Sequence, residues 1–449
     1  MTATAPAGDL VRRGLWALGV EAVYGRPLPG VPVVDVDAPD VAALLAEAHL
    51  LVHRSRCAVH DGGVVTVLDR SARPPVAAPP ALGVDDPDGL VAVWREVDRR
   101  LRAPATAGAV ALHLGLDPAA PMPDRPPVPP DPVDRWVAPD PDALERLAAA
   151  RAPVALVGPG VADHARLPGL HALAAAADLG VLNTWGAKGV FDWRSRHHWA
   201  TVGLQARDLE LGGLAAADVV VAAGLDDREV PGGARPASPV VTVDPGALGP
   251  LAERWHRPRA ELPVPPLRAG LAAVTQEGWG RRALPLAPTQ LTRSYSAVAG
   301  PGGLVAADPG TAGYWVARTF PTTGLGGAVV PARAGAHGLA AACVAVARLR
   351  RPGRPALAVV DVHADADAGE DAVLHAATRR VIDAARQLGV AVPVEVWDPG
   401  GPALGPDAHA ERLRSALAAD RPPTLPVATD PAQLGRMIDV AGEIVAWQR

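Results

Sequence analysis

Short apolar runs alternate with amphipathic stretches along most of the chain. Five runs of four or five residues are rich in Val, Leu and Ala, which is typical of strands buried on both faces of a sheet. These runs cover residues 154–157, 219–222, 240–243, 356–360 and 392–396. Between them, apolar residues recur every three or four positions, which predicts helices. The helical segments cover residues 142–150, 167–177, 372–388 and 431–446. This alternation predicts an α/β fold in which helices cover parallel sheets.

Two proline clusters divide the chain. Proline fixes φ and lacks an N–H, so its clusters mark places where regular structure ends. One cluster begins after Asp117 and continues to Pro132, and a looser one spans residues 258–288. A chain of 449 residues is also too long for one ordinary domain. We therefore predict three parallel-sheet α/β domains at residues 1–120, 136–257 and 289–449, joined by linkers at 121–135 and 258–288.

Composition and charge exclude several classes of protein. The net charge of −5 and the pI near 6.2 give no basic surface for nucleic acid or an anionic membrane. Cys57 and Cys343 are far apart and have no metal-ligand spacing, which fits a reducing compartment. The chain shows no export signal and no apolar run long enough to span a membrane. We therefore expect a cytoplasmic protein. Lys188 is the only lysine, a skew to which we attach no function.

The middle third carries the firmest motif. A strand at 154–157 ends in Gly158-Pro-Gly160, a helix follows, and Leu179-Gly-Val-Leu-Asn-Thr184 forms a second strand, which makes a βαβ unit. Next come Thr184-Trp-Gly-Ala-Lys-Gly-Val-Phe191 and Ala217-Asp-Val-Val-Val-Ala-Ala-Gly-Leu-Asp-Asp-Arg228. In this order the segments resemble the central domain of acetolactate synthase and its relatives, a family of thiamine-diphosphate (ThDP) enzymes.

The flanking segments are similar to the other two domains of that family. Residues 15–25 are similar to the opening of its pyrimidine-binding domain, and residues 108–117 to the close of that domain. Ala306-Ala-Asp-Pro-Gly310 resembles the entry to its diphosphate-binding domain, and Arg333-Ala-Gly-Ala-His-Gly338 resembles the glycine-rich turn there. The resemblance implies the three-domain arrangement of ThDP-dependent decarboxylases and carboligases, with a shortened first domain.

The resemblance also implies ThDP and Mg²⁺ as cofactors, and the first domain departs from the family pattern. The family places a glutamate ahead of a helix, where it hydrogen-bonds the aminopyrimidine ring and promotes formation of the reactive cofactor. Here Pro39 or Asp40 stands ahead of the helix at 41–51, and Asp40 is also a typical acid of a helix start. The Ser-Gly-Pro-Gly loop expected after the strand at 64–67 is replaced by the residues from Leu68 to Pro75.

The third domain also departs from the family pattern. The Gly-Asp-Gly motif expected after the strand at 356–360 admits the diphosphate and binds Mg²⁺, but the chain has Asp361-Val362-His363. The paired Asn of the family map onto Trp397-Asp398 or Asp398-Pro399. We therefore expect no bound cofactor, no metal and no identified catalytic residue. The positions that remain of the pocket are Asp308, Gly310, His337, Asp361, His363 and Asp398. The central domain holds FAD or ADP in relatives, and Gly158-Pro-Gly160 leaves that binding possible.

Other polar clusters have two interpretations each. The run from Asp361 to Asp371 holds five carboxylates and His363, which suits Ca²⁺ or Mg²⁺, but acidic loops after strands are usually solvated. The pair His197-His198, and His53 with His60 around Cys57, are interpreted as packing or surface residues. The same holds for His337.

Three hypotheses follow for function. The first is a ThDP-enzyme scaffold that has lost its cofactor and acts as a pseudoenzyme, partner subunit or binding protein. The second is a repurposed enzyme that uses the inter-domain cleft for a 2-oxo acid or a nucleotide-like ligand. The third is an active ThDP decarboxylase or carboligase with an atypical metal site at Asp361, His363 and Asp398. The resemblance implies a homo-oligomer, a dimer or tetramer, and a further protein partner is possible.

Overall fold

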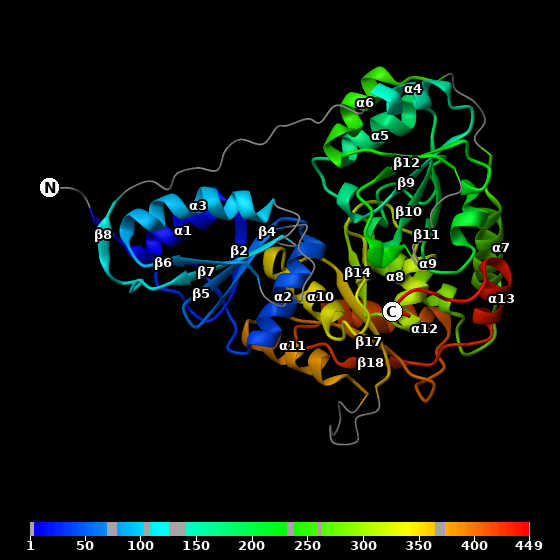
Figure 1. Ribbon diagram of the computed structural model, residues 1–449. Coiled ribbons are helices and arrows are strands. Elements are labelled where there is room, and N and C mark those ends of the chain that lie inside the picture. Colours follow the sequence, from blue (N-terminus) through cyan, green and yellow to red (C-terminus); the bar gives the residue numbers. More distant parts are fainter. Residues whose placement is uncertain are drawn as a thin grey trace. The chain divides into compact units, whose positions relative to one another are not determined.

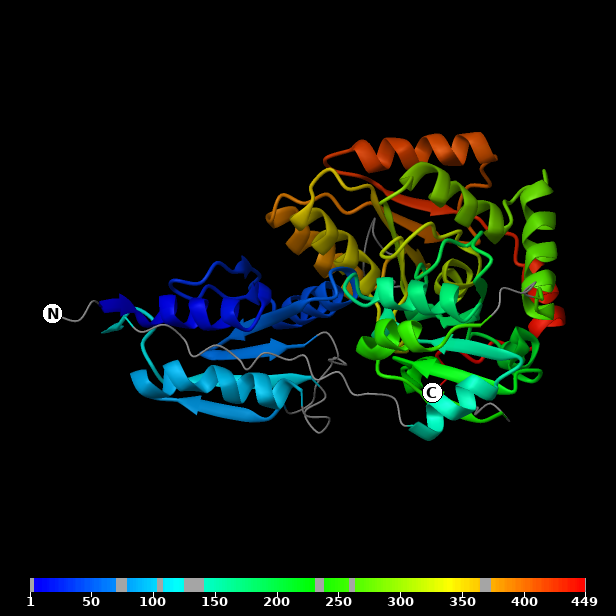
Figure 2. The same ribbon diagram turned by 90° about the horizontal axis from the view of Figure 1, so that it is seen from above.

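The computed structural model describes residues 4–69, 79–102, 108–124, 141–230, 238–257, 263–363 and 373–448. They form two compact units, which can be followed by colour in Figures 1 and 2. The first unit contains residues 1–134 together with 345–350 and 377–390, and the second contains the rest of the chain. The linker predicted at 121–135 lies mostly outside the described residues, but Pro121–Pro123 forms a short strand, β8, which pairs antiparallel with β1 (Thr4–Pro6).

The first unit is built on a sheet of mixed direction with the strand order β3-β2-β4-β5-β7-β6. Its strands are β2 (Val20–Gly25), β3 (Val34–Asp35), β4 (Arg56–Asp61), β5 (Val64–Leu68), β6 (Ala81–Val84) and β7 (Ala109–Leu114). A hairpin at Gly62 and Gly63, both with positive φ, makes β5 antiparallel to β4 and to β7. The sheet was predicted to be parallel, but in this unit its pairs β4–β5 and β5–β7 are antiparallel. Strand β5 runs against β4 because Gly62 and Gly63 allow a tight turn between them.

Three helices cover this sheet. They are α1 (Ala7–Ala17), α2 (Pro39–Val52) and α3 (Pro87–Leu101). Helices α1 and α3 pack so closely that a Cβ on Gly14 would lie 1.8 Å from the Trp94 ring. Along β4, Ala58 faces this core, while the neighbouring Cys57 thiol contacts the backbone of α2. Successive side chains of a strand point to opposite faces, so α2 covers the second face.

The second unit contains two parallel sheets. The sheet of the central region has the order β11-β10-β9-β12-β13. Its strands are β9 (Pro153–Val157), β10 (Gly180–Thr184), β11 (His198–Val202), β12 (Val219–Ala223) and β13 (Val240–Thr242). The helices of this region are α4 (Pro141–Ala149), α5 (Leu167–Ala176), α6 (Leu248–Arg254) and α7 (Pro266–Gly280). Buried Val and Ala side chains fill the strands, as the apolar runs predicted.

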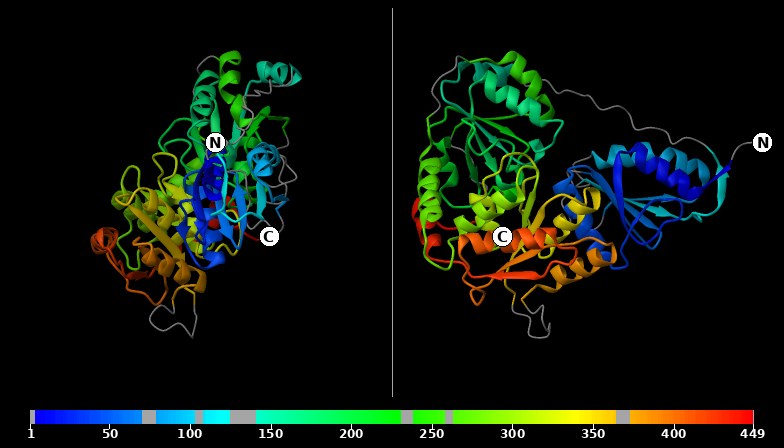
Figure 3. Two further views of the ribbon diagram at one scale, coloured as in Figure 1. Left: turned by 90° about the vertical axis from the view of Figure 1, so that its left-hand side faces the viewer. Right: turned by 180° about the vertical axis from the view of Figure 1, so that it is seen from behind.

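The sheet of the C-terminal region has the order β15-β14-β16-β17-β18, and all its pairs are parallel. Its strands are β14 (Leu304–Ala307), β15 (Ala328–Val329), β16 (Ala356–Asp361), β17 (Val394–Trp397) and β18 (Thr424–Val427). The helices that follow in this part of the chain are α8 (Pro288–Ala299), α9 (Thr311–Thr319), α10 (Leu339–Arg350), α11 (Ala376–Gln387), α12 (Pro406–Ala418) and α13 (Gln433–Ala441). Nearly all of α11 and the last turns of α10 belong to the first unit. Helices α8 and α12 pack against each other (Figure 3). The two sheets of the second unit share buried side chains, including Trp185 and Leu204 from the central region.

The predicted fold class is confirmed, and most element bounds agree within a few residues. The main difference is the helix predicted at 431–446, which is shorter because Gly442, at φ 80°, ends α13 at Ala441. In the part of the chain that the structure describes, no helix is both long and apolar enough to cross a membrane.

Candidate functional site

The chain order of the C-terminal sheet reverses between β14 and β16. From β14 the chain crosses to β15 on one side and then to β16 on the other. In such open parallel sheets, ligands bind outside the carboxyl ends of the strands at the point of reversal. Asp308 follows β14, and Asp361 is the last residue of β16. These two predicted positions therefore lie where the topology favours a ligand site.

The Asp308 carboxylate is buried and holds the start of helix α10. It accepts the backbone N–H groups of Gly338 at 2.8 Å and Ala340 at 2.7 Å. Burial raises the pKa of Asp308 to about 7, although the backbone N–H groups oppose this effect, and the charge of Asp361 raises it further. Asp308 is thus a carboxyl group whose protonation state changes near neutral pH.

The Asp361 carboxylate reaches helix α9 across Gly310. It accepts the N–H of Ala312 at 3.0 Å in the first turn of that helix. Gly310 has a φ of 141°, and a Cβ there would lie 2.2 Å from Asp361 Oδ2. Only glycine combines this conformation with this close approach. Burial raises the pKa of Asp361, with the N–H groups of Ala312 and Thr311 opposing.

We expect Gly310→Ala to destabilise the second unit by about 1–3 kcal/mol, because the new methyl group displaces the Asp361 carboxylate from Ala312. Gly300→Ala is the matched control, since Gly300 has a φ of 65° but no atom within 4 Å of an added Cβ. Urea unfolding of both variants measures the difference. Equal losses would mean that backbone conformation alone, and not the contact with Asp361, requires glycine at position 310.

Three histidines gather beside these carboxylates. The ring of His337 stacks on that of His375 with centroids 4.4 Å apart, and the ring of His363 lies 4.8 Å from His375. The N–H of His363 donates to the carbonyl of Val373 at 2.9 Å. Burial lowers the pKa of His337, and the neighbouring His363 and Arg333 lower it further. His375 was not predicted, although it follows the acidic run by only a few residues.

Asp398 lies at the end of the next strand, β17, and its carboxylate accepts the N–H of Gly400 at 2.8 Å. This contact closes a local turn. Within the described ranges, no three His, Cys, Asp or Glu side chains are placed to hold a metal ion. Residues 364–372, most of the acidic run, lie outside those ranges. The structure therefore brings Asp308, Gly310, His337, Asp361 and His363 together, and places Asp398 on the neighbouring strand.

The candidate residues of the first unit have structural roles or partners within that unit. Pro39 is the first residue of α2, and Asp40 in its first turn pairs with Arg380 at 2.8 Å. His60 Nδ1 lies 2.8 Å from the carbonyl of Arg26. His53 Nε2 lies 3.3 Å from the carbonyl of Val346, also within the first unit. The segment that replaces the Ser-Gly-Pro-Gly loop lies mostly at 70–78, outside the described residues.

The glycine turn of the central sheet packs against its own neighbouring strand end. The N–H of Gly160 donates to the carbonyl of Gly224 at 2.8 Å. A Cβ on Gly158 would lie 2.5 Å from Gly224 O, and one on Gly160 would lie 2.7 Å from Gly224 Cα. These glycines are therefore explained by the close approach of two backbone segments after β9 and β12, without a phosphate group.

Nearby, the Glu229 carboxylate is buried against β10. It accepts the hydroxyl of Thr184 and, at 3.1 Å, the N–H of Gly186. Burial raises the pKa of Glu229 to about 7. His197 Nδ1 lies 2.8 Å from the carbonyl of Leu179, as expected of a packing residue.

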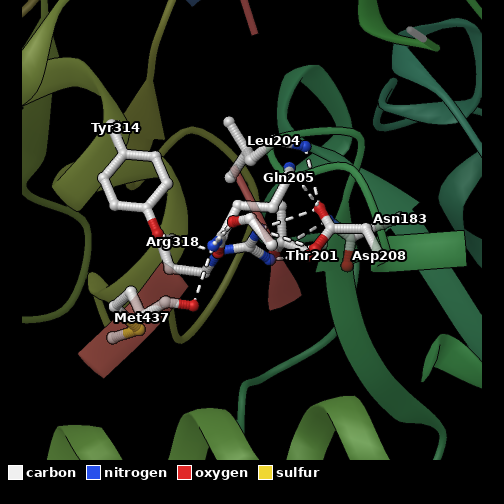
Figure 4. A network of polar contacts seen from close by, with 9 residues as sticks. Asn183, Thr201, Leu204, Gln205, Asp208, Tyr314, Arg318 and Met437 are labelled. Atoms are coloured by element: carbon white, nitrogen blue, oxygen red, sulfur yellow. Dashed lines mark hydrogen bonds and ion pairs between the residues drawn. The ribbon is translucent and has the colours of Figure 1, made fainter. Parts of the chain in front are cut away.

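A buried polar network joins the two sheets of the second unit (Figure 4). Arg318 of α9 donates to both oxygens of Asp208 at 2.8 Å and to the carbonyl of Thr201 at 2.7 Å. Tyr314 donates its hydroxyl to Gln205, whose amide donates to the carbonyl of Met437. The side chains of Arg318 and Asp208 are 0% and 1% exposed. Sequence reasoning missed this pair, because the two residues are 110 positions apart.

Comparison with known proteins gives one match in sequence and one in fold. Residues 141–248 match the family model described as thiamine pyrophosphate enzyme, central domain. No curated protein matches the sequence. Among solved structures, the chain is similar to a protein isolated from Mycobacterium smegmatis and provisionally assigned as a thiamin diphosphate-dependent enzyme. The TM-score is 0.69 and the identity 16%, with 96% of this chain and 100% of that chain covered.

These matches correct one expectation. The departures at Pro39, Leu68 and Asp361 predicted a chain without a cofactor, but both matches are to proteins of the thiamine diphosphate-dependent kind. Departures from a motif at three places in the sequence therefore did not predict the class of protein that the chain matches. Residues 141–248 match the central domain of the thiamine pyrophosphate enzyme family, and the chain has the fold of the solved structure from Mycobacterium smegmatis.

Proposed function

We propose that the chain is a ThDP-dependent enzyme that acts on a 2-oxo acid. The observation that carries this proposal is the convergence of Asp308, Gly310 and Asp361 at the reversal point of the C-terminal sheet. The central domain of the family at 141–248 and the similarity in fold support it. When bound, ThDP supplies an electron sink for the charge that develops when a bond beside a carbonyl group breaks.

The described residues fit the diphosphate end of this cofactor in donor chemistry. Mg²⁺ prefers oxygen ligands, and carboxylates follow three adjacent strands at Asp308, Asp361 and Asp398. Because Asp308 and Asp361 already bind the starts of α10 and α9, they act in this proposal as positioning residues. In this proposal Mg²⁺ would be held by Asp398 together with carboxylates of the acidic run, such as Asp365, which lies outside the described residues.

The residues in the place of the family's glutamate fit the aminopyrimidine ring of ThDP less well. This observation favours a second candidate function. Pro39 has no carboxylate, and that of Asp40 is paired with Arg380. A protein that binds ThDP without activating it would act as a partner or regulatory subunit. This second proposal shares the cofactor site with the first and differs in the absence of turnover.

Calorimetry with ThDP and Mg²⁺ on the full-length protein tests both proposals. We expect micromolar binding, weakened at least about tenfold in an Asp365→Ala/Asp367→Ala variant through loss of metal ligands. An Asp407→Ala/Glu411→Ala variant is the control, because it removes two exposed carboxylates from α12 and is expected to bind normally.

Turnover separates the two proposals. Release of CO₂ from a panel of 2-oxo acids by the loaded protein supports an enzyme, whereas binding without turnover supports the partner subunit. Absence of binding at millimolar ThDP would contradict both. We also propose a homo-oligomer, a dimer or tetramer, on the basis of the family resemblance, and light scattering measures this state.

A further inference from the structure

A buried glutamine joins two helices of the second unit. Gln205 lies just after β11 and is 2% exposed. Its amide nitrogen donates to the carbonyl of Met437 at 2.9 Å, and its amide oxygen accepts the hydroxyl of Tyr314 at 2.8 Å (Figure 4). The same nitrogen donates to the carbonyl of Gly442 at 2.6 Å. Backbone carbonyls only accept hydrogen bonds, so these partners fix the orientation of the amide. Gln205 therefore ties the end of α13 to helix α9.

A short segment, residues 442–447, holds the backbone around Gln205. It begins with the glycine that ends α13, whose φ of 80° allows the chain to change direction. Gln205 and Ile444 then pair as an antiparallel bridge. The N–H of Val445 donates to the carbonyl of Leu204 at 3.0 Å. The segment therefore fixes both the backbone and the side chain of Gln205.

The other end of this segment is anchored by Trp447. Its indole N–H donates to the carbonyl of Pro331 at 2.9 Å, and its ring centroid lies 5.6 Å from that of the buried Trp185. Trp447 has a φ of 60°, a conformation that a residue other than glycine keeps only when its surroundings stabilise it. The position of the segment therefore depends on the contacts of Trp447.

Helix α9 connects Gln205 to the candidate site. The N–H of Tyr314 donates to the carbonyl of Gly310 at 2.9 Å and closes the first turn of the helix. In the same turn, the N–H of Ala312 donates to the Asp361 carboxylate at 3.0 Å. Arg318 anchors the last turn of α9, so the Tyr314 hydroxyl is the anchor nearer to the site. Since hydrogen bonds join the residues of one helical turn, a shift of Tyr314 also shifts the N–H groups that hold Asp361.

We propose that Gln205 and Tyr314 are positioning residues that couple the segment 442–447 to the candidate site. While the segment is in place, the Gln205 amide holds the Tyr314 hydroxyl, and the first turn of α9 presents its N–H groups to Asp361. Loss of the segment's contacts frees the amide and loosens that turn. This coupling rests on the proposed function, because Asp361 belongs to the ThDP site proposed above.

Hydrogen exchange of the full-length protein without ligand tests the coupling directly. Tyr314→Phe removes only the hydroxyl, and Trp447→Ala removes the contacts at the far end of the segment. We expect the amides of residues 310–316 to exchange about two- to tenfold faster in both variants, as for the loss of about one net hydrogen bond. Tyr24→Phe is the matched control, because it removes a buried hydroxyl that contacts His49 at 2.9 Å in the first unit.

A double variant separates coupling from ordinary loss of stability. If one route joins the two sites, Tyr314→Phe already breaks it, so Tyr314→Phe/Trp447→Ala is expected to exchange at residues 310–316 about as fast as Tyr314→Phe alone. Effects that multiply in the double variant would show two independent losses and would overturn the proposal. The same conclusion would follow from equal acceleration in all elements of the second unit, or from unchanged exchange at 310–316 in both single variants.

Calorimetry with ThDP and Mg²⁺ adds a second measurement. We expect Tyr314→Phe and Trp447→Ala to raise the Kd by about two- to tenfold, the equivalent of about one net hydrogen bond, and Tyr24→Phe to leave it unchanged. Normal binding by both variants would overturn the coupling and leave the proposed function intact. Absence of binding by the wild type would contradict the proposed function, and exchange at residues 310–316 would still decide whether the segment acts on α9.

Discussion

Arg318→Met is expected to destabilise the second unit by about 3–5 kcal/mol, because it leaves the carboxylate of Asp208 buried without its counter-ion. Among the described residues, Asp208 then retains only the N–H groups of Leu204 and Gln205, at 2.8 and 3.0 Å. Urea unfolding followed by tryptophan fluorescence measures the loss. The same substitution breaks the bond to the Thr201 carbonyl, which ties α9 to β11.

Two controls separate this buried pair from ordinary surface pairs. Arg207→Met removes the partner of Glu210, an ion pair whose side chains are 49% and 58% exposed, and is expected to change the free energy of unfolding by at most about 1 kcal/mol. The double variant Arg318→Met/Asp208→Asn is expected to recover much of the loss, since no buried charge remains. A loss below about 1 kcal/mol in Arg318→Met would contradict the prediction.

The contribution of Asp308 to the stability of the second unit is expected to fall as the pH rises from about 4 to about 7, and Asp308→Asn is expected to remove this contribution. The pKa of Asp308 is raised to about 7 in the folded chain, compared with about 3.9 for an unfolded Asp. The folded state therefore holds more protons in this interval, so its favourable contribution is complete below pH 4 and is lost toward pH 7. A shift of this size corresponds to about 4 kcal/mol over the whole interval.

The measurement is the free energy of urea unfolding at several pH values for the wild type and for Asp308→Asn. The amide introduced at position 308 changes the contacts with Gly338 and Ala340. The comparison therefore uses the slope of the free energy of unfolding against pH and not its absolute value. Glu229→Gln offers an independent case, because burial also raises the pKa of Glu229 to about 7. Identical slopes in the wild type and both variants would contradict the prediction.

Part of the candidate site could be predicted from the sequence. The resemblance to the family's motifs selected Asp308, Gly310 and Asp361, and the structure places Asp308 after β14 and Asp361 at the end of β16. Asp40 was also predicted as an acidic residue in the first turn of a helix, and it lies in the first turn of α2. His375 was missed, because it becomes a neighbour of His337 only when β16 and α10 come together.

The cofactor expectation failed for a related physical reason. The sequence comparison required a glycine and an acid at fixed places after β16, and their absence was interpreted as loss of the site. Parallel strands deliver their ends to one edge, so a carboxylate of another strand or of a following loop can occupy the same region of space. The order of strands in the sheet therefore says more about which side chains can meet at a site than their spacing along the chain does.

The sequence by itself determined the α/β class, six strands and four helices of the central and C-terminal regions, and the motif of the central region, since these depend on local periodicity and on one continuous stretch of chain. Only the tertiary structure decided the pairing of Arg318 with Asp208 and the stacking of His337 on His375. Each of these joins residues from separate elements. Burial then changes their energetics, because the cost of a charge depends on its surroundings in space and not on its neighbours in the chain.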